Sequence, residues 1–216
     1  MPRPRSLTDA QIADAALAVV ERGGADALTM SALARELGVA TMSLYRYVDG
    51  REHVETLMLD RILATLDCEP PQDEPWTSQA LTLLVRLHDA IVKHPGAVPL
   101  VLARRSSATQ SLRWGEALLS VLATAGLTGE PLVIAFRSLL SYVVGAIQVD
   151  QLGSLAGPGT AEIATLDAAA FPHLVAAARQ ARTITSTAEF TRGAESLIAG
   201  LARNNQLDRK ARSRRR

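Results

Sequence analysis

The sequence predicts an all-α protein with two unequal domains. Aromatic residues make up only 4% of its 216 residues, whereas alanine and leucine are abundant, and both are strong helix formers. Apolar side chains recur at intervals of three and four residues, and the apolar–polar alternation typical of strands is scarce. With 48% hydrophobic residues, the chain can bury enough surface for a small domain and a larger one.

The sequence favours a cytoplasmic protein without membrane contacts. Cys68 is the one cysteine, which excludes an internal disulfide and favours a reducing compartment. The N-terminal sequence MPRPRSLTD lacks the apolar core of a signal peptide. The most apolar run, residues 132–149, has nearly the length of a membrane span. Because it contains Arg137 and Gln148, we expect it to form a buried helix instead.

The net charge of +1 hides an uneven distribution. Residues 209–216, RKARSRRR, hold six of the 23 basic residues, which leaves 17 for the rest of the chain against 22 acidic residues. Any nucleic-acid binding by this mildly acidic body must therefore depend on local placement of charge. We expect 209–216 to be a disordered basic tail, which either improves solubility or adds non-specific attraction to phosphates.

The first predicted helix supports the segments that follow it. Thr8 and Gln11 have the spacing of a capping box, in which each side chain accepts the other residue's backbone N–H. Gly23 and Gly24 end the helix. Its apolar stripe comprises Ile12, Ala16, Val19 and Val20.

Residues 29–48, TMSALARELGVATMSLYRYV, predict two short helices joined by a sharp turn. Thr29 or Ser31 can cap the first of them. Gly38 can adopt the left-handed conformation that such a turn requires. This pattern is typical of a helix-turn-helix, whose second helix enters the major groove of DNA. The alternative is a plain hairpin within a helix bundle.

The second of these segments carries side chains suited to DNA. Leu44 and Val48 are four residues apart and share the inward face. Hydroxyls and phenols can bind phosphate oxygens, a guanidinium can form two hydrogen bonds to guanine, and methionine can touch a thymine methyl. The predicted contacts in this segment are Thr41, Met42, Ser43, Tyr45, Arg46 and Tyr47.

A domain boundary is predicted after the next helix. Residues 51–66 form an amphipathic pattern, and Arg51 in its first turn can donate to a phosphate. The acidic segment EPPQDEP at 69–75 cannot continue a helix. Further helices are expected at 76–94, 107–125, 130–152, 166–182 and 187–201, with a loop at 152–165.

Two of the later helices suggest a dimer interface. The helix at 130–152 is apolar on almost every face and therefore needs burial all round. A symmetric copy of this helix can approach a seam of small side chains at Ser138, Ser141 and Gly145. The last helix presents further small and apolar residues for the same interface, among them Phe190, Ala194 and Leu197.

The run LTMSALARELGVATMSLYRYVDGREHVETLMLD resembles the DNA-binding domain of the tetracycline-repressor (TetR) family of bacterial transcription regulators. From Trp76 onward, with HPG at 94–96 and LTGEPLVIAFRSLLSYVVGAIQVDQ, the chain is similar to the tetracycline-repressor branch itself. The resemblance implies a homodimer that binds operator DNA. It implies a DNA-binding domain at 1–66 and an effector-binding and dimerisation domain at 67–208. It also implies phosphate contacts at Thr29, Ser31 and Arg51, beside the six contacts named above.

The positions expected to bind a ligand differ from those of the tetracycline-repressor branch. Leucines stand at 63, 83 and 87, where tetracycline-binding members tend to place polar or aromatic ligand contacts. His88 and His94 lie six residues apart on different faces of a helix, so we expect no metal site and no cofactor. We predict an unidentified, lipophilic small-molecule effector, with core packing as the alternative role of each lining residue. The predicted lining comprises Leu63, Leu83, Leu87, Trp114, Phe136 and Tyr142.

Three functions are therefore compared. The leading one is a ligand-responsive repressor, a homodimer that binds a palindromic operator and is released by its effector. The second is a structural dimerisation module whose basic tail binds nucleic acid without sequence preference. An all-α enzyme is the least favoured, because the sequence contains no Gly-x-Ser-x-Gly, no His-Glu-x-x-His, no P-loop and no Cys–His pairing.

Overall fold

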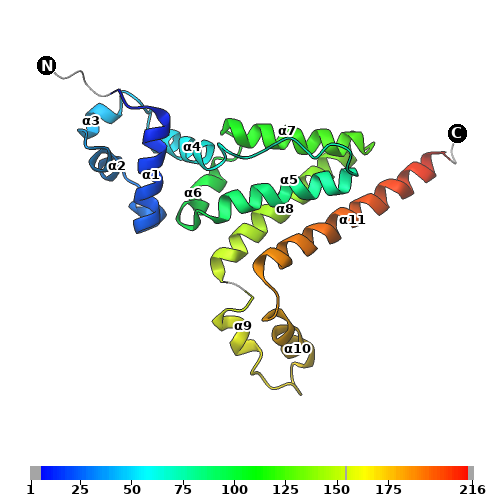
Figure 1. Ribbon diagram of the computed structural model, residues 1–216. Coiled ribbons are helices and arrows are strands. Elements are labelled where there is room, and N and C mark those ends of the chain that lie inside the picture. Colours follow the sequence, from blue (N-terminus) through cyan, green and yellow to red (C-terminus); the bar gives the residue numbers. More distant parts are fainter. Residues whose placement is uncertain (1–5, 154, 214–216) are drawn as a thin grey trace. The chain divides into compact units, whose positions relative to one another are not determined.

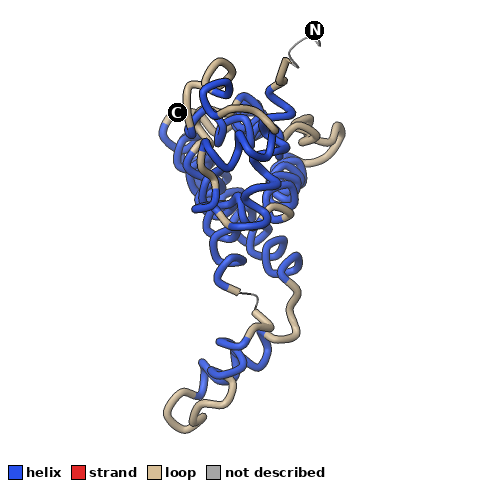
Figure 2. The backbone as a smooth tube through the Cα atoms, turned by 90° about the vertical axis from the view of Figure 1, so that its left-hand side faces the viewer, coloured by secondary structure: helices blue, strands red, loops and turns tan. Residues whose placement is uncertain are grey.

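A computed structural model describes residues 6–153 and 155–213 of the chain. Within these residues every regular element is a helix, as Figure 2 shows, which confirms the predicted all-α class. The chain divides into two compact units. Unit 1 comprises residues 1–68 and 89–117, and unit 2 comprises residues 69–88 and 118–216.

Unit 1 opens with a cluster of helices around α1. In this cluster α1 packs on both α2 and α4, and α2 packs on α3 (Figure 1). The predicted capping box is present, because Thr8 and Gln11 each accept the other's backbone N–H. The elements are α1 (Asp9–Gly23), the 3₁₀ turn η1 (Ala25–Ala27), α2 (Met30–Leu37), α3 (Thr41–Leu44) and α4 (Arg51–Ile62).

A second stretch of chain completes unit 1. It contains the end of α5 (Trp76–Val92), the 3₁₀ turn η2 (Pro95–Ala97), α6 (Val98–Ala103) and the first part of α7 (Thr109–Thr124). In this stretch η2 packs on α1, and α6 packs on α4. The prediction had placed residues 67–208 in a second domain, followed by a tail at 209–216. Residues 89–117 instead belong to unit 1, because side chains of α4 accept hydrogen bonds from Arg104 and Gln110 in this stretch.

Unit 2 contains the start of α5, the end of α7 and four further helices. Within it α8 packs on α11, and α9 packs on α10. The loop predicted at 152–165 includes the short helix α9, which begins at Pro158, a favoured first-turn residue. The four helices are α8 (Glu130–Leu152), α9 (Pro158–Ile163), α10 (Pro172–Ala181) and α11 (Ser186–Ser213).

Helix α8 is buried on one side only within unit 2, and the predicted burial of its other side by a second copy stays a prediction. One face buries Ala135, Leu139, Val143 and Ile147. The opposite face exposes Val133, Ile134, Val149 and Leu152, because the packing of unit 2 covers only one side of the helix. Among the described residues, α8 is the one helix whose length and composition would allow it to cross a membrane.

Two helices end at places other than those predicted. The segment after Gly38 is α-helical only as far as Leu44, and Leu44 O then accepts the N–H groups of Tyr47 at 2.9 Å and Val48 at 3.2 Å in a tighter turn. Helix α11 instead continues through 209–213, where a disordered tail was predicted. No glycine or proline interrupts 201–213, and basic residues suit the C-terminal end of a helix. Residues 214–216 lie outside the described residues.

Candidate functional site

The turn between α2 and α3 has helix-turn-helix geometry. The Thr29 hydroxyl accepts the N–H of Ala32 at 3.1 Å and caps α2. Gly38 adopts the left-handed conformation with φ 67°, and Val39 N–H donates to Ala34 O at 3.0 Å, which closes the helix end. Leu33 and Leu44, on the two sides of the turn, are both fully buried. The shared core therefore fixes α3 and leaves its outer face open.

That outer face presents polar and apolar groups together. Met42 is 78% exposed and Tyr45 is 48% exposed. The Arg46 guanidinium carbon lies 6.0 Å from the centroid of the Tyr47 ring, close enough for cation–π attraction to orient it. Arg46 is exposed, and Thr41, Ser43 and Tyr47 are half-buried. The structure thus brings the six predicted side chains of this segment together, while their contacts with DNA stay predictions.

All three predicted phosphate contacts are exposed, but they differ in what they bind within the protein. Thr29 and Ser31 are exposed at the start of α2. Arg51, in contrast, is engaged within the protein. Its Nε donates to Glu55 Oε1 at 2.9 Å, and its Nη2 donates to Ala25 O at 3.3 Å. These bonds occupy Nε and Nη2 of an exposed side chain, and the phosphate contact of Arg51 stays a prediction.

Ion pairs join the helices of unit 1 at their edges. Arg22 on α1 pairs with Glu36 on α2, and Arg61 on α4 pairs with Asp14 on α1 at 2.5 Å. The hydrogen bond and charge of Asp14 raise the pKa of the Arg61 guanidinium above its usual value. Both pairs are largely exposed, and solvent screens exposed ion pairs, so they add little to stability.

The charge cluster around Glu55 was missed by sequence reasoning. Glu55 is buried in α4, and Arg104, which follows α6, donates from Nε to Glu55 Oε2 at 2.8 Å. Arg104 also pairs with Glu52 at 3.1 Å. The spacing of Glu52 and Glu55 indicates one face of a helix, but nothing in the sequence pairs that face with an arginine some fifty positions later.

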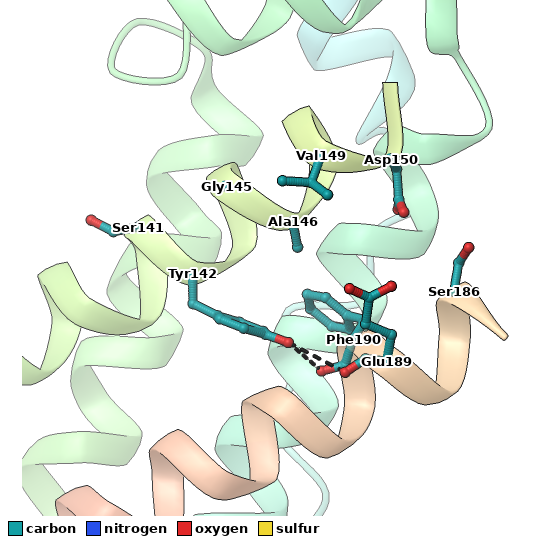
Figure 3. Close-up of a pocket in the computed structure, with 9 residues that line it drawn as sticks. All are labelled: Ser141, Tyr142, Gly145, Ala146, Val149, Asp150, Ser186, Glu189 and Phe190. Carbon is teal, nitrogen blue, oxygen red and sulfur yellow. Dashed lines mark hydrogen bonds between the residues drawn. The ribbon is translucent and has the colours of Figure 1, made fainter. Parts of the chain in front are cut away.

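Unit 2 contains a pocket of about 360 Å³ between α8 and the first turns of α11. Figure 3 shows the Tyr142 and Phe190 rings near one another, with the Glu189 carboxylate beside Phe190 and the Asp150 carboxylate farther away. An aromatic wall beside carboxylates suits an apolar molecule that carries hydrogen-bond donors or positive charge. Its lining is Ser141, Tyr142, Gly145, Ala146, Val149, Asp150, Ser186, Glu189 and Phe190.

Buried aromatic contacts fix the wall of this pocket. The His88 ring stacks on Phe190 with centroids 3.9 Å apart, and His88 Nε2 lies 3.2 Å from Asp150 Oδ2. Tyr142 donates its hydroxyl hydrogen to Phe190 O at 2.8 Å (Figure 3). Burial, and next the negative charge of Glu189, raise the pKa of the Tyr142 phenol above 10.0. Sequence reasoning had considered His88 only as a metal ligand and missed this arrangement.

Of the six predicted effector residues, the pocket includes Tyr142 alone. Leu63, Leu83, Leu87 and Trp114 are buried core side chains, and Phe136 is half-buried. Leu63 and Trp114 lie in unit 1, and the other four lie in unit 2.

The predicted dimer residues also divide into groups. Ser141 and Gly145 line the pocket, whereas Ser138 and Leu197 are half-buried elsewhere. Phe190 and Ala194 are buried inside the protomer, so they offer little surface to a second copy, and their part in a dimer interface stays a prediction. Phe190 stacks on His88 of α5, and its backbone oxygen accepts the Tyr142 hydroxyl hydrogen from α8. In the described part of the chain, no group of three or more His, Cys, Asp or Glu side chains can hold a metal ion.

Comparison with known proteins places both parts of the chain in one family. Residues 12–54 match the model described as bacterial regulatory proteins of the tetR family. Residues 69–204 match the tetracyclin repressor-like C-terminal domain.

Individual relatives have the same fold or a related sequence. The HTH-type transcriptional repressor DrrR1 of Streptomyces coeruleorubidus is 32% identical over 67% of this chain, a stretch that spans 54% of DrrR1. An HTH-type transcriptional regulator of Saccharopolyspora erythraea is 28% identical over 94% of this chain and 87% of its own length. The structure of ActR of Streptomyces coelicolor with actinorhodin has a TM-score of 0.78 at 25% identity, over 93% of this chain and 99% of ActR.

The structure agrees with both family models. The turn geometry and the exposed α3 face agree with the N-terminal model, and the helical second part agrees with the C-terminal one. The second model alone covers more than half of the chain. The chain therefore belongs to the tetracycline-repressor family of bacterial transcription regulators.

Proposed function

We propose that the protein is a cytoplasmic, ligand-responsive transcriptional repressor. It binds a palindromic operator as a homodimer and is released by a small, lipophilic effector. The observation that carries this proposal is the outer face of residues 41–47. The buried Leu44 and Val48 fix this segment from inside, while the exposed Arg46, Tyr45 and Met42 face outward with groups that bind base edges and phosphates.

Dimerisation compensates for the few basic side chains that one protomer brings to DNA. The exposed segment 41–47 brings one guanidinium, that of Arg46, and the body of the protein is acidic. Two copies related by a two-fold axis place two such segments about 34–36 Å, or a multiple, apart on a palindrome. The apolar side chains that α8 exposes support this assembly, since a second copy can cover them.

The effector is proposed to be lipophilic. Two observations support this: the aromatic wall of the pocket between α8 and α11, and the structures of the similar protein ActR with actinorhodin and (S)-DNPA. Release requires the effector to bind one arrangement of the dimer more tightly than the other, and the loss of DNA affinity cannot exceed that difference.

Selection from a random duplex pool tests the function directly. The full-length protein is incubated with random DNA, and the bound duplexes are sequenced through several rounds. The proposal expects one palindromic sequence to be enriched, with half-sites one helical turn or a multiple apart. Recovery of random sequences alone would contradict it.

The basic tail provides the control for non-specific binding. A variant that ends at residue 208 loses six basic residues. We expect it to keep its preference for the selected duplex, with weaker binding to all DNA and a smaller salt dependence. Loss of all binding would favour a dimerisation module whose tail alone contacts nucleic acid.

A further inference from the structure

The buried carboxylate of Glu55 binds two arginines that come from distant parts of unit 1. Oε1 accepts from Arg51 Nε at 2.9 Å, and Oε2 accepts from Arg104 Nε at 2.8 Å. Glu55 is only 5% exposed. A buried carboxylate is costly unless its oxygens are paired and hydrogen-bonded, and here each oxygen has its own guanidinium partner.

Arg51 connects this carboxylate to the DNA-facing part of the head. It is the first residue of α4, three positions after Val48, which ends the exposed segment. Its Nη2 donates to Ala25 O in η1, just before the cap of α2. The Arg51 side chain thus links the first turn of α4, which follows the helix-turn-helix, to η1, which precedes it.

Arg104 connects the same carboxylate to the second stretch of unit 1. It follows α6 and also pairs with Glu52, one turn before Glu55 on α4. The hydrogen bond to Glu55 raises the pKa of the Arg104 guanidinium. Near the other end of α4, Asp60 Oδ1 accepts the N–H of Gln110 at 2.9 Å. Residues 104–110 therefore bind α4 near both of its ends.

We propose that Glu55 is a positioning residue for DNA recognition, held by Arg104, and that Arg51 acts through it rather than by binding a phosphate. The paired arrangement fixes where α3 and the turn after it lie relative to α1 and α4. When Arg104 is absent, Glu55 keeps one partner and the first turn of α4 loses its second anchor. Recognition of a specific sequence then suffers more than general attraction to DNA. This inference rests on the proposed DNA-binding function.

The test compares specific with non-specific affinity. The full-length protein and its variants are titrated against the duplex selected from the random pool and against a random duplex of equal length. Arg104→Gln is the main variant, because the residue lies at the edge of the core and its loss is tolerated more easily than that of Glu55. Arg105→Gln is the matched control. It makes the same charge change one position away, in an exposed side chain whose one hydrogen bond within the described residues goes to Leu102 O.

For Arg104→Gln we expect the ratio of affinity for the selected duplex to affinity for the random duplex to fall by about tenfold. For Arg105→Gln we expect no change in this ratio. Glu55→Gln should behave like Arg104→Gln, and the double variant should lose little more than either single variant, because the two act through one contact. Partial unfolding would instead lower the active fraction for both duplexes equally. Stoichiometric titration measures that fraction separately.

Salt dependence tests the part played by Arg51. An arginine that neutralises a phosphate contributes about one unit to the slope of log affinity against log salt concentration. We expect Arg51→Gln to lower specific affinity and leave this slope unchanged. A salt slope reduced by about one unit for Arg51→Gln would overturn the inference. So would a ratio of specific to non-specific affinity that is the same for Arg104→Gln and the unmodified protein. If no duplex is enriched at all, the proposed function fails together with the inference.

Discussion

The phenol oxygen of Tyr142 occupies the space that a side chain at position 193 would need. Gly193 lies on α11, and a Cβ built on it would overlap the Tyr142 hydroxyl from α8. The same hydroxyl donates to the backbone oxygen of Phe190, one turn earlier on α11. The tyrosine therefore lies directly against the backbone of α11, and the glycine permits this approach.

The first prediction concerns this contact. Gly193→Ala should lower the free energy of unfolding by about 1–2 kcal/mol, because overpacking outweighs the gain in helix propensity. Gly200→Ala is the matched control on the same helix, since nothing lies within 4 Å of a Cβ there, and it should stabilise by about 0.5–1 kcal/mol. Urea denaturation of both variants measures the difference. Equal changes in the free energy of unfolding for the two variants would show that Tyr142 moves aside without cost.

The second prediction uses the raised pKa of Tyr142. The unfolded tyrosine ionises near pH 10, whereas the folded one keeps its proton to a higher pH. The native state therefore binds more protons above pH 10, and its stability falls there as the pH rises. Tyr142→Phe should be less stable near neutral pH, by about 1 kcal/mol for the lost hydrogen bond.

The stability difference between Tyr142→Phe and the unmodified protein should shrink above pH 10, since only the unmodified protein loses the contribution of this phenol. Denaturation curves between pH 8 and pH 11 test it. All other titrating groups are common to both proteins and cancel in the comparison. A difference that stays constant over this range would contradict the expected shift.

The features that the sequence predicted correctly are mostly local. The Thr8 capping box, the left-handed Gly38 and the inward Leu44 and Val48 each depend on residues within a few positions of one another. Helix periodicity also predicted α1, α4 and α8 to within a few residues. Local chemistry decides these features, so a single sequence is enough to find them.

The features that were missed depend on the tertiary fold. The His88–Phe190 stack and the Glu55–Arg104 pair join residues from different helices. Phe190 is an apolar residue on an amphipathic helix, and periodicity cannot tell burial against its own chain from burial against a partner. The predicted effector leucines have the same ambiguity. They are buried in the core of the protomer, and the sequence alone allowed either role.

The third prediction concerns the dimer. Among the residues that the structure describes, nothing lies within 4 Å of a Cβ built at Gly145 on α8. Gly145→Leu should therefore leave the protomer folded, while its side chain keeps a second α8 from approaching. We expect dimer dissociation to increase by at least about tenfold, since filling a tight interface costs about 1–3 kcal/mol. Sedimentation at several protein concentrations measures it.

A control for that experiment lies on α7. Ser120 is exposed and outside the predicted interface, so Ser120→Leu adds a similar apolar side chain without blocking α8. It should dimerise as the unmodified protein does. If Gly145→Leu also dimerises normally, the interface lies elsewhere on unit 2.

The fourth prediction separates base reading from phosphate binding. Arg46→Ala should relax sequence preference at one position of each half-site, at a cost of about 1–3 kcal/mol. Tyr45→Phe removes one hydroxyl and should weaken binding more evenly across sequences. Repeating the random-pool selection with each variant distinguishes the two. Equal losses on specific and random DNA for Arg46→Ala would remove its base-reading role.

Unit 1 is assembled from two stretches of chain separated by twenty residues that belong to unit 2. During synthesis, the helix-turn-helix therefore leaves the ribosome well before Arg104, and until then the buried Glu55 has Arg51 as its one guanidinium partner from this cluster. A fragment cut after Cys68 would remain in that state permanently. We therefore expect a fragment that keeps every contact of unit 1 to extend at least to the first turn of α7, well beyond residues 12–54 that match the N-terminal family model.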